Sequence, residues 1–233
     1  MLSLGYGEPG SGKSSQHKYL CTVLPDSLYL SLEYKDIEML ERSGIQFKMI
    51  ECFDDQYIED PVATLESLNR AIHEIITTNK YKNIVIDGVS DIRSYATEEW
   101  IYYDNMDRKR SNLPPRKTIH GDNLAAWQMV NGRVKKLLLP IINWANVTRN
   151  NVFFTAQFKD AYMNKTKVGR TVNVGDWCEY KVDLKIEFCH DTLDSFRIKI
   201  PKFPDWSNDT SVYDMKVEKT GLLQVLIERG LIR

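Results

Sequence analysis

The stretch that decides the fold lies near the amino terminus and reads Gly7-Glu8-Pro9-Gly10-Ser11-Gly12-Lys13-Ser14. It satisfies the pattern G-x-x-x-x-G-K-[ST], with a short apolar stretch at residues 2–4 before it and a helical pattern at residues 12–24 after it. Glycines let such a turn wrap its backbone N–H groups around a phosphate, and the amino end of the following helix adds its dipole. The stretch therefore predicts a strand, a phosphate-binding turn and a helix.

The residues of this turn have expected roles in binding ATP with Mg²⁺. Lys13 is expected to reach the β and γ phosphates, and the Ser14 hydroxyl to ligate Mg²⁺. The predicted nucleotide-binding residues are Gly7, Glu8, Pro9, Gly10, Ser11, Gly12, Lys13, Ser14 and Ser15.

A second acidic element, Asp87, ends the apolar strand Ile84-Val85-Ile86. A parallel sheet places such a residue at its carboxyl edge, where ligands bind, so Asp87 is expected to hold the Mg²⁺ through a water. The alternative interpretation is that Asp87 merely begins the turn with Gly88. The phosphate-binding turn favours the metal role.

Strands and helices alternate along the chain outward from the turn. Strands are predicted at 27–32, 47–53, 83–87 and 151–156, and helices at 12–24, 36–42, from Pro61 onward, and at about 122–146. Such alternation implies parallel pairing through right-handed crossovers, hence an α/β fold with helices covering a mainly parallel sheet. Strands at 180–188 and 194–200 predict a β-hairpin extension, and residues 222–229 a final helix. With 233 residues, we expect a single domain over residues 1–233.

Composition excludes several classes of protein. Hydrophobic residues make up 42% and charged residues 27%, as in globular chains, and the net charge of -1 excludes a uniformly basic nucleic-acid coat. The four cysteines form no C-x-x-C pair, and the longest apolar run is about half the ~20 residues of a membrane span. We therefore expect a cytoplasmic protein that has no membrane contact, in the host cytoplasm if the protein is viral.

Hydrolysis of a nucleotide requires a group that orients the attacking water. Gly88 occupies the position after Asp87, where many P-loop ATPases carry a glutamate, so the base must come from elsewhere. Glu33 ends the predicted strand at 27–32 and should emerge at the same sheet edge as Asp87. It could instead be an ordinary polar strand end or a cap for the next helix.

These features together resemble the RecA-like branch of P-loop ATPases, whose catalytic glutamate follows the second strand. Residues Phe153-Phe154-Thr155-Ala156-Gln157 look like that branch's strand ending in a glutamine that senses the γ phosphate. The resemblance implies Glu33 as the catalytic carboxylate and Gln157 as the sensor. Over about residues 1–190 the pattern is similar to AAA-type nucleotide-binding proteins of phage, archaeal viral or prokaryotic origin that resemble phage RecA-like single-strand annealing ATPases.

The resemblance also implies partners for two polar segments, at residues 93–121 and 158–175. In RecA-like proteins the corresponding loops contact nucleic acid, and here residues 102–121 and 158–175 each carry a net charge of +3, with aromatic residues nearby. The candidate contacts to single-stranded or duplex DNA are Arg108, Lys109, Arg110, Lys159 and Lys165. Simple solvation of these charges is an equally open interpretation.

RecA-like ATPases often complete each site with a cation from the neighbouring subunit of a ring or filament. Lys167 and Arg170 are the candidates by position for such a homo-oligomer, although their spacing differs from the Lys-x-Arg of hexameric helicases. The sequence thus favours an Mg²⁺-dependent ATPase acting on DNA in recombination, replication or packaging. The alternatives are a small-molecule kinase that uses residues 93–121 as a lid, and a nucleotide-gated binding protein with little turnover.

Overall fold

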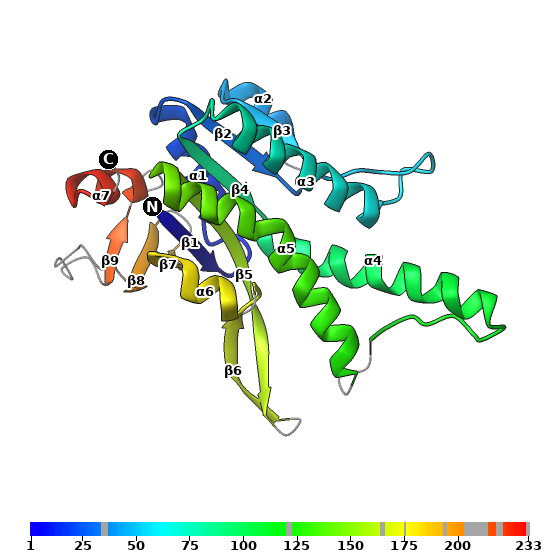
Figure 1. Cartoon of the computed structure of the whole chain (residues 1–233). Coiled ribbons are helices and arrows are strands. Elements are labelled where there is room, and N and C mark those ends of the chain that lie inside the picture. Colours follow the sequence, from blue (N-terminus) through cyan, green and yellow to red (C-terminus); the bar gives the residue numbers. More distant parts are fainter. Residues whose placement is uncertain are drawn as a thin grey trace.

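A mainly parallel sheet runs through the middle of the computed structural model, which describes residues 1–33, 37–119, 123–163, 166–174, 176–192, 195–202, 214–217 and 221–231 (Figure 1). The strand order is β3 (Phe47–Met49), β2 (Ser27–Ser31), β4 (Asn83–Asp87), β5 (Asn151–Met163), β1 (Leu2–Gly7), β7 (Leu184–Thr192), β8 (Ser195–Lys202) and β9 (Asp214–Val217). The pairs from β3 to β7 are parallel, whereas β7–β8 and β8–β9 are antiparallel. Strand β6 (Thr166–Val172) pairs antiparallel with the distal part of β5.

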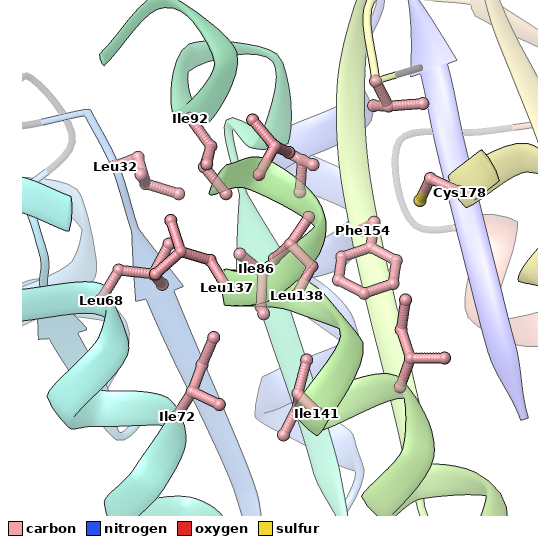
Figure 2. Close-up of a cluster of buried hydrophobic side chains, with 14 of the residues drawn as sticks. Leu32, Leu68, Ile72, Ile86, Ile92, Leu137, Leu138, Ile141, Phe154 and Cys178 are labelled. Carbon is pink, nitrogen blue, oxygen red and sulfur yellow. The ribbon is translucent and has the colours of Figure 1, made fainter. Parts of the chain in front are cut away.

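Helices cover both faces of this sheet. Buried side chains of α1 (Lys13–Val23), α2 (Ile37–Ser43) and α7 (Gly221–Glu228) join one hydrophobic cluster. Those of α3 (Pro61–Thr78), α4 (Val89–Arg110), α5 (Leu124–Thr148) and α6 (Asp176–Lys181) join the other. Figure 2 shows this second cluster, in which side chains such as Leu68, Leu138 and Cys178 gather over one face of the sheet.

Side-chain alternation along the central strands explains why both clusters form. In β4, Ile84 and Ile86 point to the α3–α5 side, while Val85 points to the α1 side. In β2, Tyr29 likewise faces α1 and its neighbours Leu28 and Leu30 face the other way. The sequences of these strands are nearly continuous apolar runs because both faces of the sheet are buried. The face that carries Tyr29 and Val85 also carries the site described below.

Local signals fix the ends of the longer helices. Asp60 caps α3 by accepting a hydrogen bond from the Ala63 N–H, with Pro61 at the first helical position. Asn123 caps α5 in the same way through the Ala126 N–H. Among the residues that the structure describes, no helix is both long enough and apolar enough to cross a lipid bilayer.

The structure confirms the α/β fold with its mainly parallel sheet and its carboxy-terminal hairpin, and it corrects several boundaries. The polar segment at 93–121 is not an extended loop, because α4 continues through it to Arg110. The segment at 158–175 is not a loop either: β5 runs on to Met163 and pairs with β6. The strand predicted at 180–188 begins only at Leu184, after α6, and the strand predicted at 47–53 ends at Met49. Strand β9, which follows the hairpin, was not predicted.

Candidate functional site

Strand order brings the predicted site residues to one edge of the sheet. β5 lies between β1 and β4, and β2 lies on the other side of β4. The register pairs Gly7 with Gln157 and Ser31 with Asp87, so β1, β2 and β4 end near one edge of the sheet, and β5 passes this edge at Gln157 before it runs on to Met163. The glycine-rich turn, Glu33, Asp87 and Gln157 consequently lie at one edge.

A cavity of about 270 Å³ lies at this edge. Its lining combines the turn with Glu33 after β2, Asp87 at the end of β4 and Gln157 within β5. The lining residues of the turn and the start of α1 are Pro9, Gly10, Gly12, Lys13, Ser14, Ser15 and Lys18. Gly7, Glu8 and Ser11, which were also predicted to bind nucleotide, support the turn without lining this cavity.

The turn has the conformation that its glycines permit. Gly10 and Gly12 have φ angles of 78° and 86°, in the left-handed region that favours glycine. At Gly7 the requirement is space, since a Cβ atom there would lie 2.3 Å from the carbonyl oxygen of Phe188. The Lys13 ammonium folds back over the turn and donates to the carbonyl oxygens of Gly7 and Glu8, at 3.1 and 2.8 Å.

Three hydroxyl groups surround the carboxylate of Asp87, which is only 4% exposed. The Ser14 hydroxyl donates to Asp87 Oδ1 at 3.1 Å, and the Thr155 hydroxyl donates to the same oxygen. The Tyr29 hydroxyl donates to Asp87 Oδ2. Thr155 Oγ1 also accepts a hydrogen bond of 2.9 Å from the Gly88 N–H, which ties β5 to the end of β4.

The chemistry of this donor set fits Mg²⁺. The ion prefers hard oxygen ligands, and it is usually held by one or two carboxylates together with the phosphates of a nucleotide rather than by an all-protein cage. Ser14 and Asp87 place a hydroxyl and a carboxylate oxygen 3.1 Å apart beside the phosphate-binding turn. These two residues are therefore the candidates to hold the ion.

Glu33 and Gln157 lie on opposite sides of Asp87 along the sheet. Glu33 follows β2, is half-buried, and also lines a neighbouring cavity of about 440 Å³ that contains Glu51, Glu59, Asp91 and Glu98. Gln157 donates its backbone N–H to the Ser90 hydroxyl at 2.7 Å. Because Ser90 belongs to the first turn of α4, this bond connects the cavity edge to that helix.

A buried histidine lies beneath the turn on the α1 side. His17 Nδ1 is 2.8 Å from the carbonyl oxygen of Lys13, and its ring contacts the rings of Phe153 and Phe188. A carbonyl oxygen can only accept, so Nδ1 carries the proton and Nε2 is the bare nitrogen. Nε2 is buried without a hydrogen-bond partner among the described residues. Burial lowers the pKa of His17, while the bond to Lys13 and the charge of Asp87 raise it less.

Sequence reasoning missed Tyr29, Lys18 and Met39, and quoted Thr155 without giving it a role. For Lys18 a signal existed, because it lies four residues after Ser14 on the same face of α1. Tyr29 carried no such signal, since within an apolar strand a tyrosine is normally a core residue. Only the register of β2 against β4 reveals that its hydroxyl reaches Asp87.

None of the candidate DNA contacts in the described part of the chain lines the cavity. Arg108, Lys109 and Arg110 are at the carboxyl end of α4, which projects well beyond the sheet (Figure 1). Lys159 is half-buried on β5. Lys165 and the side chain of Lys167 lie outside the described part of the chain. Arg170, on β6, forms an exposed ion pair with Glu8 of its own chain.

The strand order, the phosphate-binding turn and the carboxylate facing Ser14 define a P-loop nucleotide-binding protein of the α/β class. A family model described as an AAA domain matches residues 3–181, from β1 to the end of α6. The chain therefore belongs to the AAA domain family, which indicates a nucleotide-binding ATPase. A search of curated proteins found no match.

Proposed function

We propose that this protein hydrolyses ATP with Mg²⁺ and uses the reaction in DNA recombination, replication or packaging, as a homo-oligomer. The observation that carries the hydrolytic part is that Lys13, Ser14, Glu33, Asp87 and Gln157 line a single cavity. A lone phosphate-binding turn would serve a kinase or a passive binder equally well. A carboxylate at the tip of the second strand supplies the group that hydrolysis needs.

Each residue has a distinct task in the proposed reaction. The backbone N–H groups of the turn and the Lys13 ammonium hold the phosphates, and Ser14 and Asp87 hold the ion. Mg²⁺, when bound, neutralises charge on the β and γ phosphates. Glu33 orients the attacking water and accepts its proton.

Gln157 is the proposed sensor of the γ phosphate. Its backbone bond to Ser90 supports this role, because a shift at the cavity edge would reach α4. The same strand continues into the β5–β6 hairpin, which returns to the turn through the Arg170–Glu8 ion pair. A change at the γ phosphate could thus reach α4 through the hydrogen bond to Ser90 and the β5–β6 hairpin through the backbone of β5.

Arg170 and Lys167 are proposed to supply a cation to the site of a neighbouring subunit. For Arg170 this role would require exchange of its partner, because Glu8 of the same chain holds it. An exposed ion pair contributes only about 0–1 kcal/mol of stability, so breaking it would need little free energy.

Phosphate release and nucleotide binding test the proposed reaction. Glu33→Gln keeps the size of the side chain and should leave ATP binding near normal while turnover falls by orders of magnitude. Lys13→Ala should instead weaken binding itself. Glu98→Gln is the matched control, since Glu98 lines the neighbouring cavity but not this one. Unchanged turnover in Glu33→Gln would remove Glu33 from the reaction.

The oligomer is tested on the same preparations. A sizing column run with and without a nonhydrolysable ATP analogue should show assembly in its presence. A protein that stays monomeric under every condition, ignores DNA and phosphorylates a metabolite would instead be a kinase.

A further inference from the structure

The structure assigns Tyr29 a function as the positioning residue of Asp87, an assignment that rests on the proposed Mg²⁺-dependent ATP site. Tyr29 lies in the middle of β2, with no exposed surface, and its hydroxyl donates to Asp87 Oδ2. None of the site motifs includes this residue. Its role follows from a contact between two strands that are 58 residues apart in sequence.

The direction of the Tyr29 ring explains how this residue, in the middle of β2, reaches Asp87 at the end of β4. Tyr29 pairs with Val85 in the register of β2 against β4, two positions before Asp87. All three side chains point to the α1 side of the sheet, so the ring lies along this face toward Asp87. The Lys18 ammonium, which lines the nucleotide cavity, lies 5.8 Å from the ring centroid on that side.

The hydrogen bonds hold the carboxylate from both sides. Tyr29, on β2, binds Oδ2, and Thr155, on β5, binds Oδ1, so the two donors come from the two strands that flank β4. Without them the terminal torsion of an aspartate is broad and roughly two-fold. With them Oδ1 is directed toward the Ser14 hydroxyl, 3.1 Å away. Tyr29 therefore helps to fix the plane of the Asp87 carboxylate, so that one of its oxygens faces the residue expected to ligate Mg²⁺.

Removal of the Tyr29 hydroxyl should weaken the binding of Mg²⁺ and not the binding of the nucleotide. Partners that orient a metal-binding group commonly change metal affinity about 10–100-fold when they are removed. Tyr29→Phe keeps the ring, its packing and its contact with Lys18, and removes only the hydroxyl. The Mg²⁺ concentration needed for tight ATP binding should therefore rise roughly tenfold. Binding of ATP in the presence of EDTA should remain unchanged.

The experiment measures ATP binding by the full chain over a titration of Mg²⁺, and the increment in melting temperature that Mg²⁺ adds to ATP. The increment is measurable even in a destabilised variant, because a ligand that binds the folded state raises its stability in any background. Tyr95→Phe is the matched control, since Tyr95 is also a buried tyrosine that donates to a carboxylate, Glu51, but lies outside the nucleotide cavity.

A double-mutant cycle separates positioning from general support of the fold. In the Asp87→Asn background, Tyr29→Phe should cause no further shift in the Mg²⁺ midpoint, because Tyr29 acts through the carboxylate. Thr155→Val should shift the midpoint in the same direction as Tyr29→Phe. A normal midpoint in Tyr29→Phe, with a shifted one in Asp87→Asn, would overturn the assignment and leave the ATP site standing. A wild-type chain whose ATP binding ignores Mg²⁺ would overturn the proposed site itself.

Discussion

At the residue scale, His17 supports the phosphate-binding turn from below and does not line the nucleotide cavity. The ring fills the space under the turn that Gly5 leaves open: a Cβ atom at Gly5 would lie 2.7 Å from His17 Cε1 and 2.8 Å from Phe188 Cε2. Its Nδ1–H bonds the carbonyl of Lys13 in the first turn of α1. Protonation would add a donor at Nε2, which is buried beside the aromatic rings of Phe153 and Phe188.

Stability should consequently fall as the pH drops through the range in which free histidine titrates. Burial lowers the folded-state pKa of His17 below its ordinary value of 6.5, so below that pH the unfolded chain binds a proton that the folded chain does not. The contribution of the neutral ring is present above pH 6.5 and is lost as the pH falls toward the folded pKa. Between pH 7.5 and 5.5, wild type should lose more stability than His17→Asn.

Urea denaturation at a series of pH values measures this difference. The asparagine keeps a donor near the Lys13 carbonyl and does not titrate, so acid effects on carboxylates elsewhere cancel in the comparison. If the free energy of unfolding of the two proteins changed equally with pH, His17 would not change its protonation on unfolding.

At the scale of elements, polar contacts fasten α4 to α5 and to the segment that joins the two helices. The Arg133 guanidinium binds both carboxylate oxygens of Glu99 at 2.8 Å, and the two side chains are 29% and 12% exposed. Arg116 packs over the ring of Trp100 and binds Asp104. These contacts add to the packing of Trp100 and Ile101 against the hydrophobic core.

Arg133→Ala should therefore destabilise the protein by about 1.5–3 kcal/mol, since it leaves a largely buried carboxylate without its bidentate partner. Hydrogen exchange should become faster in the outer half of α4, whereas ATP binding should persist because the cavity lies at the other end of the helix. Arg133→Lys is the control: it keeps the charge but loses the planar fork, so it should recover only part of the stability. Full recovery in the lysine variant would mean that charge alone holds the helix.

The sequence could predict the elements that form through local signals, and it could not predict those that depend on contacts between distant residues. Strands β2 and β4, helix α3 and the turn carry apolar periodicity, glycines and caps, which are local signals, and each was predicted near its observed position. The outer half of α4 is rich in polar and charged residues, and Arg133, which binds Glu99 of α4, is 34 residues away, so no clear local pattern indicates a helix there. Glu33 and Asp87 were placed correctly at one edge because parallel strands end together. Tyr29 was missed because its role depends on register, which a single sequence does not specify.

At the scale of the whole molecule, the chain carries a net charge of only -1 but has three consecutive cations at the projecting tip of α4 (Figure 1). Lys109 and Arg110 are exposed there, and Arg108 is half-buried. The exposed rings of Tyr102 and Tyr103 lie one to two turns before them, 5.3 Å apart between centroids. Cations next to exposed aromatic rings are the combination that binds single strands with little sequence preference.

If this tip contacts DNA as proposed, its charges should determine the salt dependence of binding. Each contacted phosphate of a single strand contributes about -0.7 to the slope of log K against log salt. Replacing Arg108, Lys109 and Arg110 by glutamine should therefore reduce the magnitude of the slope by about 2 and weaken binding most at low salt. Fluorescence anisotropy with a labelled oligonucleotide, at several salt concentrations and with ATP present, measures both quantities.

The matched control replaces Lys135 and Lys136, two exposed lysines on α5, by glutamine. These changes should leave the slope nearly unaltered, because α5 carries them along its side and not at the projecting tip. An equal loss in the control would indicate a diffuse electrostatic effect, and an unchanged slope in the tip variant would remove α4 from the DNA contact.

Because the tip is remote from the cavity, ATP turnover without DNA should be the same in all three proteins. Any stimulation of turnover by DNA should disappear with the tip charges, since only bound DNA can act on Gln157 through α4 and Ser90.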